Sequence, residues 1–283
     1  MTVLVNLIVT LGMGVIVPVG LRLTDPAGPH VLARWWPLLA APGAVCLWLP
    51  RGTAATVLAA LYAAATLALA LRGLLRLRSV LRRTPHAGTR APVPAEVAVV
   101  TALLSPAVAA TALVAERAGV RLFGFDLDIL ALTVPHFHYA GFAAALVAGL
   151  VCRAAPAGPW ARWAAYSVPG GTALVLAGYF VDDWAELAGS LVLTAGMWAV
   201  ALLTWREIRP GAPGRGTRAL LAVSAAVLVA TMLLALWWAV GEATGIPHPT
   251  LTWMAATHGL GNALGFALCS VLAWRRLAAG DRR

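Results

Sequence analysis

Three histidines and an asparagine lie within apolar segments of the chain, where no water is expected to solvate them. His136 and His138 lie in the stretch VPHFHYAGF, and His258 and Asn262 lie four residues apart in ATHGLGNALGF. A polar side chain in hydrocarbon costs several kcal/mol unless a partner satisfies it. Such residues normally face the interior of a helix bundle, where they form hydrogen bonds with one another or handle a proton, an ion or a ligand.

Two acidic stretches could supply a proton. FGFDLDIL contains Asp126 and Asp128, and YFVDDWAEL contains Asp182, Asp183 and Glu186. Crowded or buried carboxyl groups hold their protons more tightly than isolated ones. A carboxylic acid that stays protonated near neutral pH can donate that proton in catalysis. Acids in the first turn of a helix also complement the helix dipole, so helix capping is the alternative interpretation of both stretches.

Aromatic side chains accompany these groups. The chain has 12 Trp, and most fall at the ends of apolar runs, where an interfacial aromatic belt is their usual role. An aromatic-lined interior can also stabilise a cation through its π faces. Packing in the core is the alternative role of each of these side chains. A helix that continued through residue 182 would place Tyr179 beside Asp183. The candidate substrate-binding residues are Tyr139, Phe142, Tyr179, Trp184, Trp198, Trp237, Trp238 and Asn262.

The composition is that of a membrane protein. The 283 residues are 61% hydrophobic and only 11% charged, with a mean hydropathy of +0.83, whereas soluble domains are ~25% charged. All 21 basic residues are Arg, and the formal net charge is +10. No basic stretch is interleaved with stacking aromatic residues, so we expect these arginines to meet anionic lipid rather than nucleic acid.

The apolar runs predict an all-α bundle of transmembrane helices, forming one domain over residues 1–283. A bilayer core requires ~20 apolar residues for each helix. We expect about nine spans (seven to nine), and the second or third is the one expected to be short or re-entrant. The arginine distribution predicts an external N-terminus and a cytoplasmic C-terminus in a bacterial cytoplasmic membrane, with Arg51, Arg117 and Arg121 outside. The nine segments are 2–22, 31–50, 53–71, 96–115, 127–151, 161–180, 184–205, 218–240 and 250–274.

The two histidine stretches are expected to lie at similar depth. Ten residues separate Asp126 from His136, which corresponds to ~15 Å of helix and places His136 near the bilayer midplane. Pro135 allows a kink that opens space between helices. His258 and Asn262 share a face near the middle of the last span. We therefore predict that the two stretches converge on one intramembrane site; a structural network of hydrogen bonds between helices is the alternative.

Nothing in the sequence calls for a metal or another cofactor. Cys46, Cys152 and Cys269 are isolated and have no metal-ligand spacing. Histidines on different spans could ligate a b-type haem, and the string HFHY recurs in subunit I of haem–copper oxidases. That likeness covers four residues only, and the other histidine motifs of the oxidases are absent. We therefore predict no cofactor and keep haem or quinone binding as an alternative.

The segments PHFHYAGF and HGLGNALGF together resemble the YndJ-like family of bacterial integral membrane proteins, over roughly residues 95–275. Some actinobacterial members of this family resemble the membrane-bound terpene cyclases of drimentine-type biosynthesis. The resemblance implies a proton-initiated (class II type) cyclisation of a farnesyl chain carried by an indole-containing diketopiperazine or a similar aromatic substrate. The partners it implies are this lipophilic prenylated substrate and membrane lipid.

In that chemistry an acid protonates an alkene, aromatic faces stabilise the carbocation, and a base removes the last proton. The resemblance assigns the acid role to the five carboxyl groups and a positioning role to His136, His138 and His258. Soluble class II cyclases use a DxDD motif, whereas FDLDIL offers only D-x-D and FVDDW only D-D. The identity of the acid therefore stays open. A proton-coupled transporter of small solutes is a further alternative, although no inverted repeat is evident.

Overall fold

A computed structural model describes residues 2–25, 28, 30–82 and 93–280 of the chain. The described residues form helices and connecting turns and contain no β-strand, as the composition predicts. They group into two compact units. Unit 1 comprises residues 1–81 and 100–143, and unit 2 comprises residues 82–99 and 144–283. Two helices run through the boundaries between the units, and the prediction of a single domain stays a prediction.

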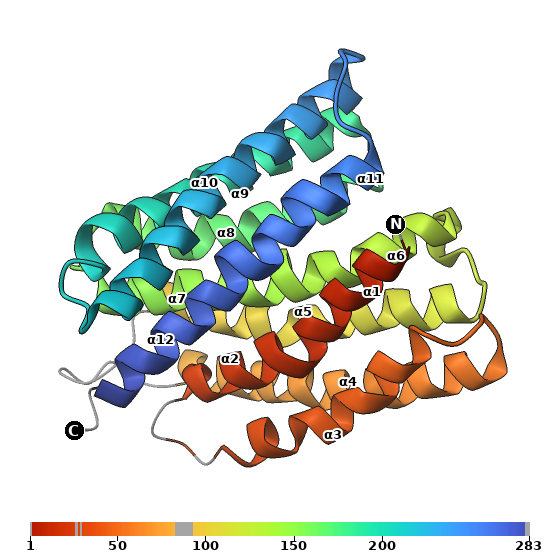
Figure 1. Cartoon of the computed structure of the whole chain (residues 1–283), viewed down its shortest axis with the longest axis horizontal. Helices are drawn as coiled ribbons and strands as arrows, with labels where there is room; N and C mark the ends of the chain where they lie inside the picture. The colour runs from red at the N-terminus through yellow and green to blue at the C-terminus, as the bar shows by residue number, and fades with distance from the viewer. Residues whose placement is uncertain (1, 26–27, 29, 83–92, 281–283) are drawn as a thin grey trace. The chain divides into compact units, whose positions relative to one another are not determined.

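Unit 1 contains a long N-terminal helix, a helical hairpin, and parts of the two helices that continue into unit 2. The N-terminal helix Val3–Thr24 is interrupted by a π-helical turn, and α3 packs beside α4 as a hairpin (Figure 1). Its elements are α1 (Thr2–Leu11), η1 (Gly12–Ile16), α2 (Val17–Thr24), α3 (Val31–Cys46), α4 (Thr53–Leu81), α5 (Val93–Arg117, from residue 100), η2 (Leu122–Gly124), α6 (Leu127–His136) and η3 (Phe137–Ala143).

Unit 2 is built on three consecutive helices that pack side by side, α8 on α9 and α9 on α10, and the last helix returns along α10 (Figure 1). Its elements are α7 (Ala144–Ala154), α8 (Pro159–Gly178), α9 (Asp183–Leu203), η4 (Thr204–Ile208), α10 (Arg215–Thr244), α11 (Leu251–Met254), η5 (Ala255–Gly259), η6 (Gly261–Leu268) and α12 (Cys269–Gly280).

Seven helices of the described chain are long and apolar enough to cross a membrane. They are Val3–Thr24, Thr53–Leu81, Val93–Arg117, Leu127–Ala154, Asp183–Ile208, Arg215–Thr244 and Leu251–Ala279. This number lies within the predicted range of seven to nine, and the protein is a membrane protein. The orientation of its termini stays a prediction.

Two of the nine predicted segments are not among the seven. The segment 31–50 forms only the 16-residue helix α3, so the expectation of one short segment is confirmed. The segment 161–180 corresponds to α8, which has 20 residues but a lower hydropathy because it carries Arg162, Tyr166 and two prolines. The helix predicted over 53–71 extends to Leu81, since arginine is a good helix former and does not end it.

Helix ends follow from local chemistry. At the end of α5, Gly119 has a φ of +70°. The Gly119 N–H donates to Glu116 O at 3.2 Å and the Val120 N–H to Ala115 O at 2.9 Å, the pattern of a Schellman motif. The helix α10 ends at Gly245, whose φ is +74° and whose N–H donates to Gly241 O. The first turn begins the loop that carries Asp126, and the second begins the loop that carries His248.

Glycines let α8 and α9 approach closely. Gly171 and Gly178 on α8, and Gly189 and Gly196 on α9, are each spaced by seven residues. A Cβ atom added at Gly171 would lie 2.5 Å from Leu193 Cα. A Cβ atom added at any of the other three glycines would also collide with an atom of the opposite helix. In a membrane, such small residues allow backbones to meet and gain van der Waals packing.

Replacing Gly171 by Ala should destabilise unit 2 by about 1–3 kcal/mol, because the added methyl group would collide with the backbone of α9. The neighbouring Gly170 on α8 has nothing within 4 Å of its own added Cβ, so Gly170→Ala should be neutral or slightly stabilising. Reversible unfolding of both variants in detergent measures the difference. Equal stability of the two variants would contradict the packing of α8 on α9.

Candidate functional site

Both histidine stretches fold as π-helix rather than α-helix. The first forms η3 just after Pro135, and the second forms η5 and η6. The π-helical turn is rare and is found mostly at functional sites. The two stretches belong to different units, η3 to unit 1 and η5–η6 to unit 2, so their convergence on one site stays a prediction.

His138 is a fully buried, fully hydrogen-bonded residue of unit 1. Its Nδ1 lies 2.8 Å from Val134 O, and its Nε2 lies 2.6 Å from the Tyr62 hydroxyl. A carbonyl can only accept, so Nδ1 carries a hydrogen. Full burial disfavours a charged ring, so Nε2 has no hydrogen and accepts from the Tyr62 hydroxyl. His138 is therefore a neutral imidazole with both nitrogens engaged. No sequence pattern indicated Tyr62, which lies 76 residues away on α4.

The Tyr62–His138 pair is enclosed by close packing. The ring of Trp36 meets Tyr62 edge-on at 6.3 Å, and its Nε1–H donates to Met13 O at 3.0 Å. A Cβ atom added at Gly43 would lie 2.6 Å from Tyr62 Cγ. Nothing in this packing leaves His138 a nitrogen with which to bind a ligand. The alternative interpretation, a structural hydrogen-bond network, therefore describes His138.

The aromatic residues of the first stretch also belong to the core of unit 1. The Tyr139 hydroxyl donates to Ile8 O at 2.8 Å, and Phe142 is fully buried. His136 is half-buried, and its ring lies 5.9 Å from that of Phe137. In unit 1, Tyr139 and Phe142 thus fill space that a substrate cavity would need.

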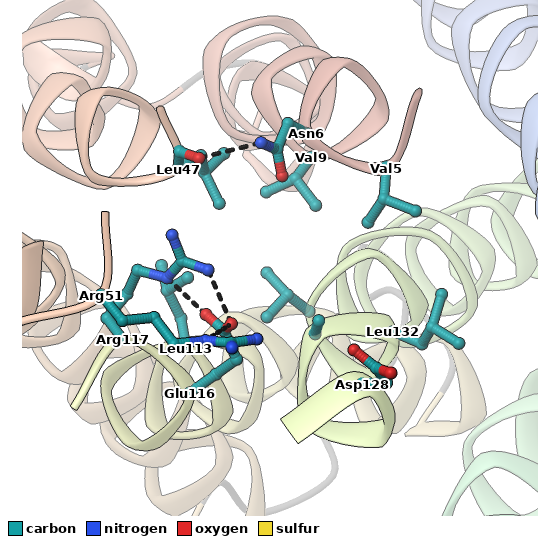
Figure 2. Close-up of a pocket in the computed structure, with 12 residues that line it drawn as sticks. Val5, Asn6, Val9, Leu47, Arg51, Leu113, Glu116, Arg117, Asp128 and Leu132 are labelled. Carbon is teal, nitrogen blue, oxygen red and sulfur yellow. Dashed lines mark hydrogen bonds and ion pairs between the residues drawn. The ribbon is translucent and has the colours of Figure 1, made fainter. Parts of the chain in front are cut away.

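A buried ion cluster lies in unit 1 (Figure 2). The Glu116 side chain is 2% exposed, Arg51 Nε lies 2.9 Å from its Oε1, and Arg117 donates to both of its carboxylate oxygens. Arg117 also donates to Leu49 O at 3.2 Å. Two arginines thus neutralise one buried carboxylate and fasten the turn between α3 and α4 to the end of α5.

A small pocket adjoins this cluster. It has a volume of about 60 Å³ and is lined partly by Asn6, Glu116 and Asp128 (Figure 2). Pockets for organic ligands measure ~300–1,000 Å³, so a farnesyl chain does not fit here. Asp128 is exposed at the edge of this pocket, and Asp126 is an exposed residue paired with Arg121. Asp126 therefore has a cationic partner.

The second stretch forms a closed ring of hydrogen bonds with α10 in unit 2. His258 Nδ1 lies 2.8 Å from Thr231 O, and Asn262 Nδ2 lies 3.1 Å from His258 Nε2. The Thr231 hydroxyl donates to Asn262 Oδ1 at 2.8 Å. His258 and Asn262 share a face, as predicted. Gly261 and Gly265 allow the close approach, since a Cβ atom at Gly265 would lie 2.7 Å from a methyl of Val227.

An acidic group lies in unit 2 at the turn between α8 and α9. The Tyr179 hydroxyl donates a hydrogen bond to the Glu186 carboxylate, and Asp183 and Glu242 lie close enough for their charges to act on Glu186. His248 Nε2 lies 3.1 Å from Glu242 Oε1. We name Tyr179, Asp183, Glu186, Glu242 and His248 the Glu186 cluster.

This arrangement corrects the expectation for Tyr179 and decides between the two interpretations of Asp182. The helix does not continue from α8 into α9, so Tyr179 faces Glu186 instead of Asp183. The interruption comes from Asp182, whose Oδ1 accepts the Ala185 N–H at 2.8 Å as the N-cap of α9. Capping therefore describes Asp182. Desolvation of the hydroxyl and the Glu186 charge raise the pKa of Tyr179, so Tyr179 stays protonated although the ring edge is exposed.

Two members of the Glu186 cluster, Glu242 and His248, were missed in the sequence. His248 lies between two prolines in GIPHPT, after the end of α10. The sequence feature that could have indicated this residue is Glu242, an acid near the end of the apolar helix that precedes GIPHPT. The five side chains do not surround one point. Within the part of the chain that the structure describes, no three His, Cys, Asp or Glu side chains are close enough to hold a metal ion.

Tryptophans contact His248 of the Glu186 cluster and the loop that carries it. The ring of Trp238 meets that of His248 edge-on at 4.9 Å, and Trp237 meets Trp253 at 6.4 Å. Trp237 Nε1–H donates to Pro247 O at 2.9 Å. Three of the four tryptophan candidates are exposed, Trp184 at 62%, Trp237 at 47% and Trp198 at 37%. One aromatic ring, that of Trp238, therefore lies against His248 of the Glu186 cluster.

The comparison with known protein families decides the relationship of this chain. The profile described as YndJ-like protein matches residues 7–266. The chain belongs to the YndJ-like family. No curated protein and no solved structure matches it. The Glu186 cluster and the stretches η3 and η5 of this YndJ-like protein lie within the matched residues, and η6 extends two residues beyond them.

Removing the hydroxyl of Tyr62 should destabilise unit 1 by about 0.5–2 kcal/mol, because His138 Nε2 would lose its donor in a buried site. Tyr62→Phe should show this loss in detergent unfolding. Tyr166→Phe provides the control, since Tyr166 is 47% exposed. Stability of Tyr62→Phe equal to the control would contradict the assigned hydrogen bond.

Neutralising Glu116 should cost more than neutralising Asp126. Glu116→Gln leaves a buried arginine without its counter-charge, which costs about 3–5 kcal/mol. Asp126→Asn breaks an exposed pair worth about 0–1 kcal/mol. Unfolding free energies of the two variants at one salt concentration give the comparison, and similar losses would show that the Glu116 cluster is not buried in the membrane-embedded protein.

Proposed function

We propose that this YndJ-like protein is a membrane-embedded terpene cyclase that protonates a farnesyl chain carried by an indole, diketopiperazine or similar aromatic substrate. The observation that carries the proposal is the Glu186 cluster. It combines a carboxyl group hydrogen-bonded to a tyrosine with two neighbouring acids and an adjoining group of tryptophans. An acid, a polar partner and aromatic faces are what a proton-initiated cyclisation requires.

Glu186 is the acid that we assign among the five candidates. Asp126 is paired with Arg121, and Asp182 caps α9. Within the described residues no arginine forms an ion pair with Asp183, Glu186 or Glu242. Neighbouring carboxyl groups without a cationic partner share a proton more readily than isolated ones.

The proposed reaction begins when the Glu186 hydroxyl transfers its proton to a terminal alkene carbon. The alkene π electrons form the new C–H bond and leave a tertiary carbocation, which further alkenes attack to close rings. The faces of Trp237, Trp238 and Trp253 stabilise the positive charge. Loss of one proton from the last cation regenerates an alkene, so the product is an isomer of the substrate.

The membrane supplies the rest of the chemistry. A farnesyl chain partitions into lipid, and a dry apolar site keeps water from capturing the cation. The host we propose is a bacterium that makes prenylated indole secondary metabolites (meroterpenoids), with the enzyme in its cytoplasmic membrane. The proposed mechanism uses protons alone and needs no cofactor.

Membranes that contain the wild-type protein should convert a farnesylated indole diketopiperazine into an isomeric cyclised product. Glu186→Gln should lower the rate by about 100-fold or more, because the amide cannot donate the initiating proton. Chromatography with mass detection measures the product. Glu207→Gln is the matched control, since Glu207 is an exposed acid at the other end of the same helix and should retain the wild-type rate.

Two results would reject the proposal. A wild-type protein that forms no isomer from prenylated aromatic substrates would remove the cyclase assignment. A Glu186→Gln protein with the wild-type rate would remove Glu186 as the acid. Proton-driven solute uptake by liposomes that contain the protein, without a new product, would favour the transporter alternative.

A further inference from the structure

The small pocket of unit 1 contains a buried amide oxygen to which no described residue donates. Asn6 is 8% exposed, and its Nδ2 donates to Leu47 O at 2.8 Å. A carbonyl can only accept, so the amide nitrogen must face Leu47 and Oδ1 must face away from it. Figure 2 shows Oδ1 turned toward the middle of the pocket that Asn6 lines. The pocket therefore offers an acceptor for a donor that the chain itself does not supply.

Opposite charges line two sides of this pocket (Figure 2). On one side, Glu116 binds both Arg51 and Arg117, which leaves one net positive charge. The Arg51 side chain is 47% exposed, so part of its guanidinium group is accessible at the mouth of the pocket. On the other side, the exposed Asp128 carboxylate has no ion pair or hydrogen bond with any residue that the structure describes. A complementary ligand therefore carries a positive hydrogen-bond donor next to a negative group.

The volume of the pocket selects a small donor group. The pocket measures about 60 Å³, and one water molecule occupies ~30 Å³ in the liquid. There is thus room for a group of about two water molecules, such as the CH₂–NH₃⁺ end of an ethanolamine. A primary ammonium group has three N–H donors, which suit Asn6 Oδ1 and the Asp128 carboxylate. A trimethylammonium group is larger and donates no hydrogen bond.

The pocket lies at the ends of three helices that are long enough to cross the membrane. Asn6 is near the start of one helix, Glu116 is near the end of another, and Asp128 is near the start of the third. The three helices are Val3–Thr24, Val93–Arg117 and Leu127–Ala154. The ends of such helices lie at the level of the lipid headgroups. A headgroup can therefore reach this pocket from the surrounding bilayer.

Apolar side chains beside the pocket provide a place for the rest of a lipid molecule. Leu7, the neighbour of Asn6, is 54% exposed, and Trp48, the neighbour of Leu47, is 50% exposed. An exposed tryptophan near a helix end is typical of the headgroup region. These side chains distinguish a lipid from a small soluble zwitterion, which would gain nothing from them.

Simple ions complement the pocket less well than a zwitterion does. A metal cation would meet the positive charge of the two arginines. An inorganic anion would meet the Asp128 carboxylate and would leave Asn6 Oδ1 without a donor. A ligand with both charges satisfies both sides.

We propose that this pocket binds the headgroup of a phospholipid that carries a primary ammonium group, the headgroup of phosphatidylethanolamine. The ammonium group donates to Asn6 Oδ1 and to the Asp128 carboxylate, and the phosphodiester accepts from Arg51. The bound lipid joins the start of α1, the turn between α3 and α4, and the start of α6. Lipid binding at this site needs no turnover and is independent of the cyclase proposed above.

Native mass spectrometry of the full-length protein in detergent, titrated with single lipids, tests the proposal. Phosphatidylethanolamine should bind at least about 10-fold more tightly than phosphatidylcholine, whose ammonium group has no N–H, or phosphatidylglycerol, which has no cation. Equal affinities for the three lipids would overturn the proposal, because they would show adhesion of lipid without recognition of the ammonium group. Glycerophosphoethanolamine, the headgroup without acyl chains, should compete only weakly. Competition as strong as that of the lipid would overturn the assignment to a lipid.

Asp128→Asn tests the residues of the pocket. This change should weaken the binding of phosphatidylethanolamine by about 10-fold, as expected for loss of a hydrogen bond between charged groups, and should leave phosphatidylcholine binding unchanged. Asp126→Asn is the matched control, since it removes the same charge two residues away from a side chain outside the pocket. Asn6→Ala, which removes the accepting oxygen, should also weaken binding. Wild-type affinity for phosphatidylethanolamine in Asp128→Asn would overturn the proposed site.

Discussion

The scarcity of water inside a membrane is the constraint on which the rest of this structure depends. A buried donor or acceptor must find its partner within the protein. Many hydroxyl groups solve the problem locally by donating to the carbonyl four residues earlier, as do Thr10, Ser105, Thr111, Thr133, Ser167 and Thr172. Groups that cannot be satisfied within their own helix tie helices together. His138 and Tyr62, and likewise His258, Asn262 and Thr231, are of this second kind.

The same constraint determines which acids remain available for chemistry. The three arginines predicted on the outer side are all engaged in unit 1, two with Glu116 and one with Asp126. The Glu186 cluster has no such cation among its described contacts and is balanced by a tyrosine hydroxyl and a histidine. The first acidic group is therefore bound to arginines, whereas the second is bound by hydrogen bonds. The type of partner therefore distinguishes the acids of unit 1 from the Glu186 cluster, which their spacing in the sequence does not.

The sequence predicted what depends on periodicity and composition. The helical class, the apolar spans, the short α3 and the shared face of His258 and Asn262 follow from patterns within one helix. Partners across helices were not accessible in this way. Nothing near VPHFHYAGF indicates that His138 would meet Tyr62, or that Tyr139 would reach Ile8 O.

The conformations of two turns account for the other differences between the sequence-based predictions and the structure. Asp182 adopts an extended backbone as the N-cap of α9, which ends the helical pattern and turns Tyr179 toward Glu186. His248 was overlooked because it lies in a loop between two prolines rather than in an apolar run, although Glu242 stands six residues earlier. The search for polar residues at membrane depth thus selected His138 and His258, whose ring nitrogens are both hydrogen-bonded, and did not include His248, which lies beside Glu242.

The central claim is that cyclisation starts with a proton that the protein donates and water resupplies. Cyclisation of the farnesylated substrate in D₂O tests it most directly, since the enzyme's exchangeable protons become deuterons. The account predicts a product with one deuterium, on the carbon of the terminal alkene that received the initiating proton. A cyclised product without deuterium at that carbon would contradict it.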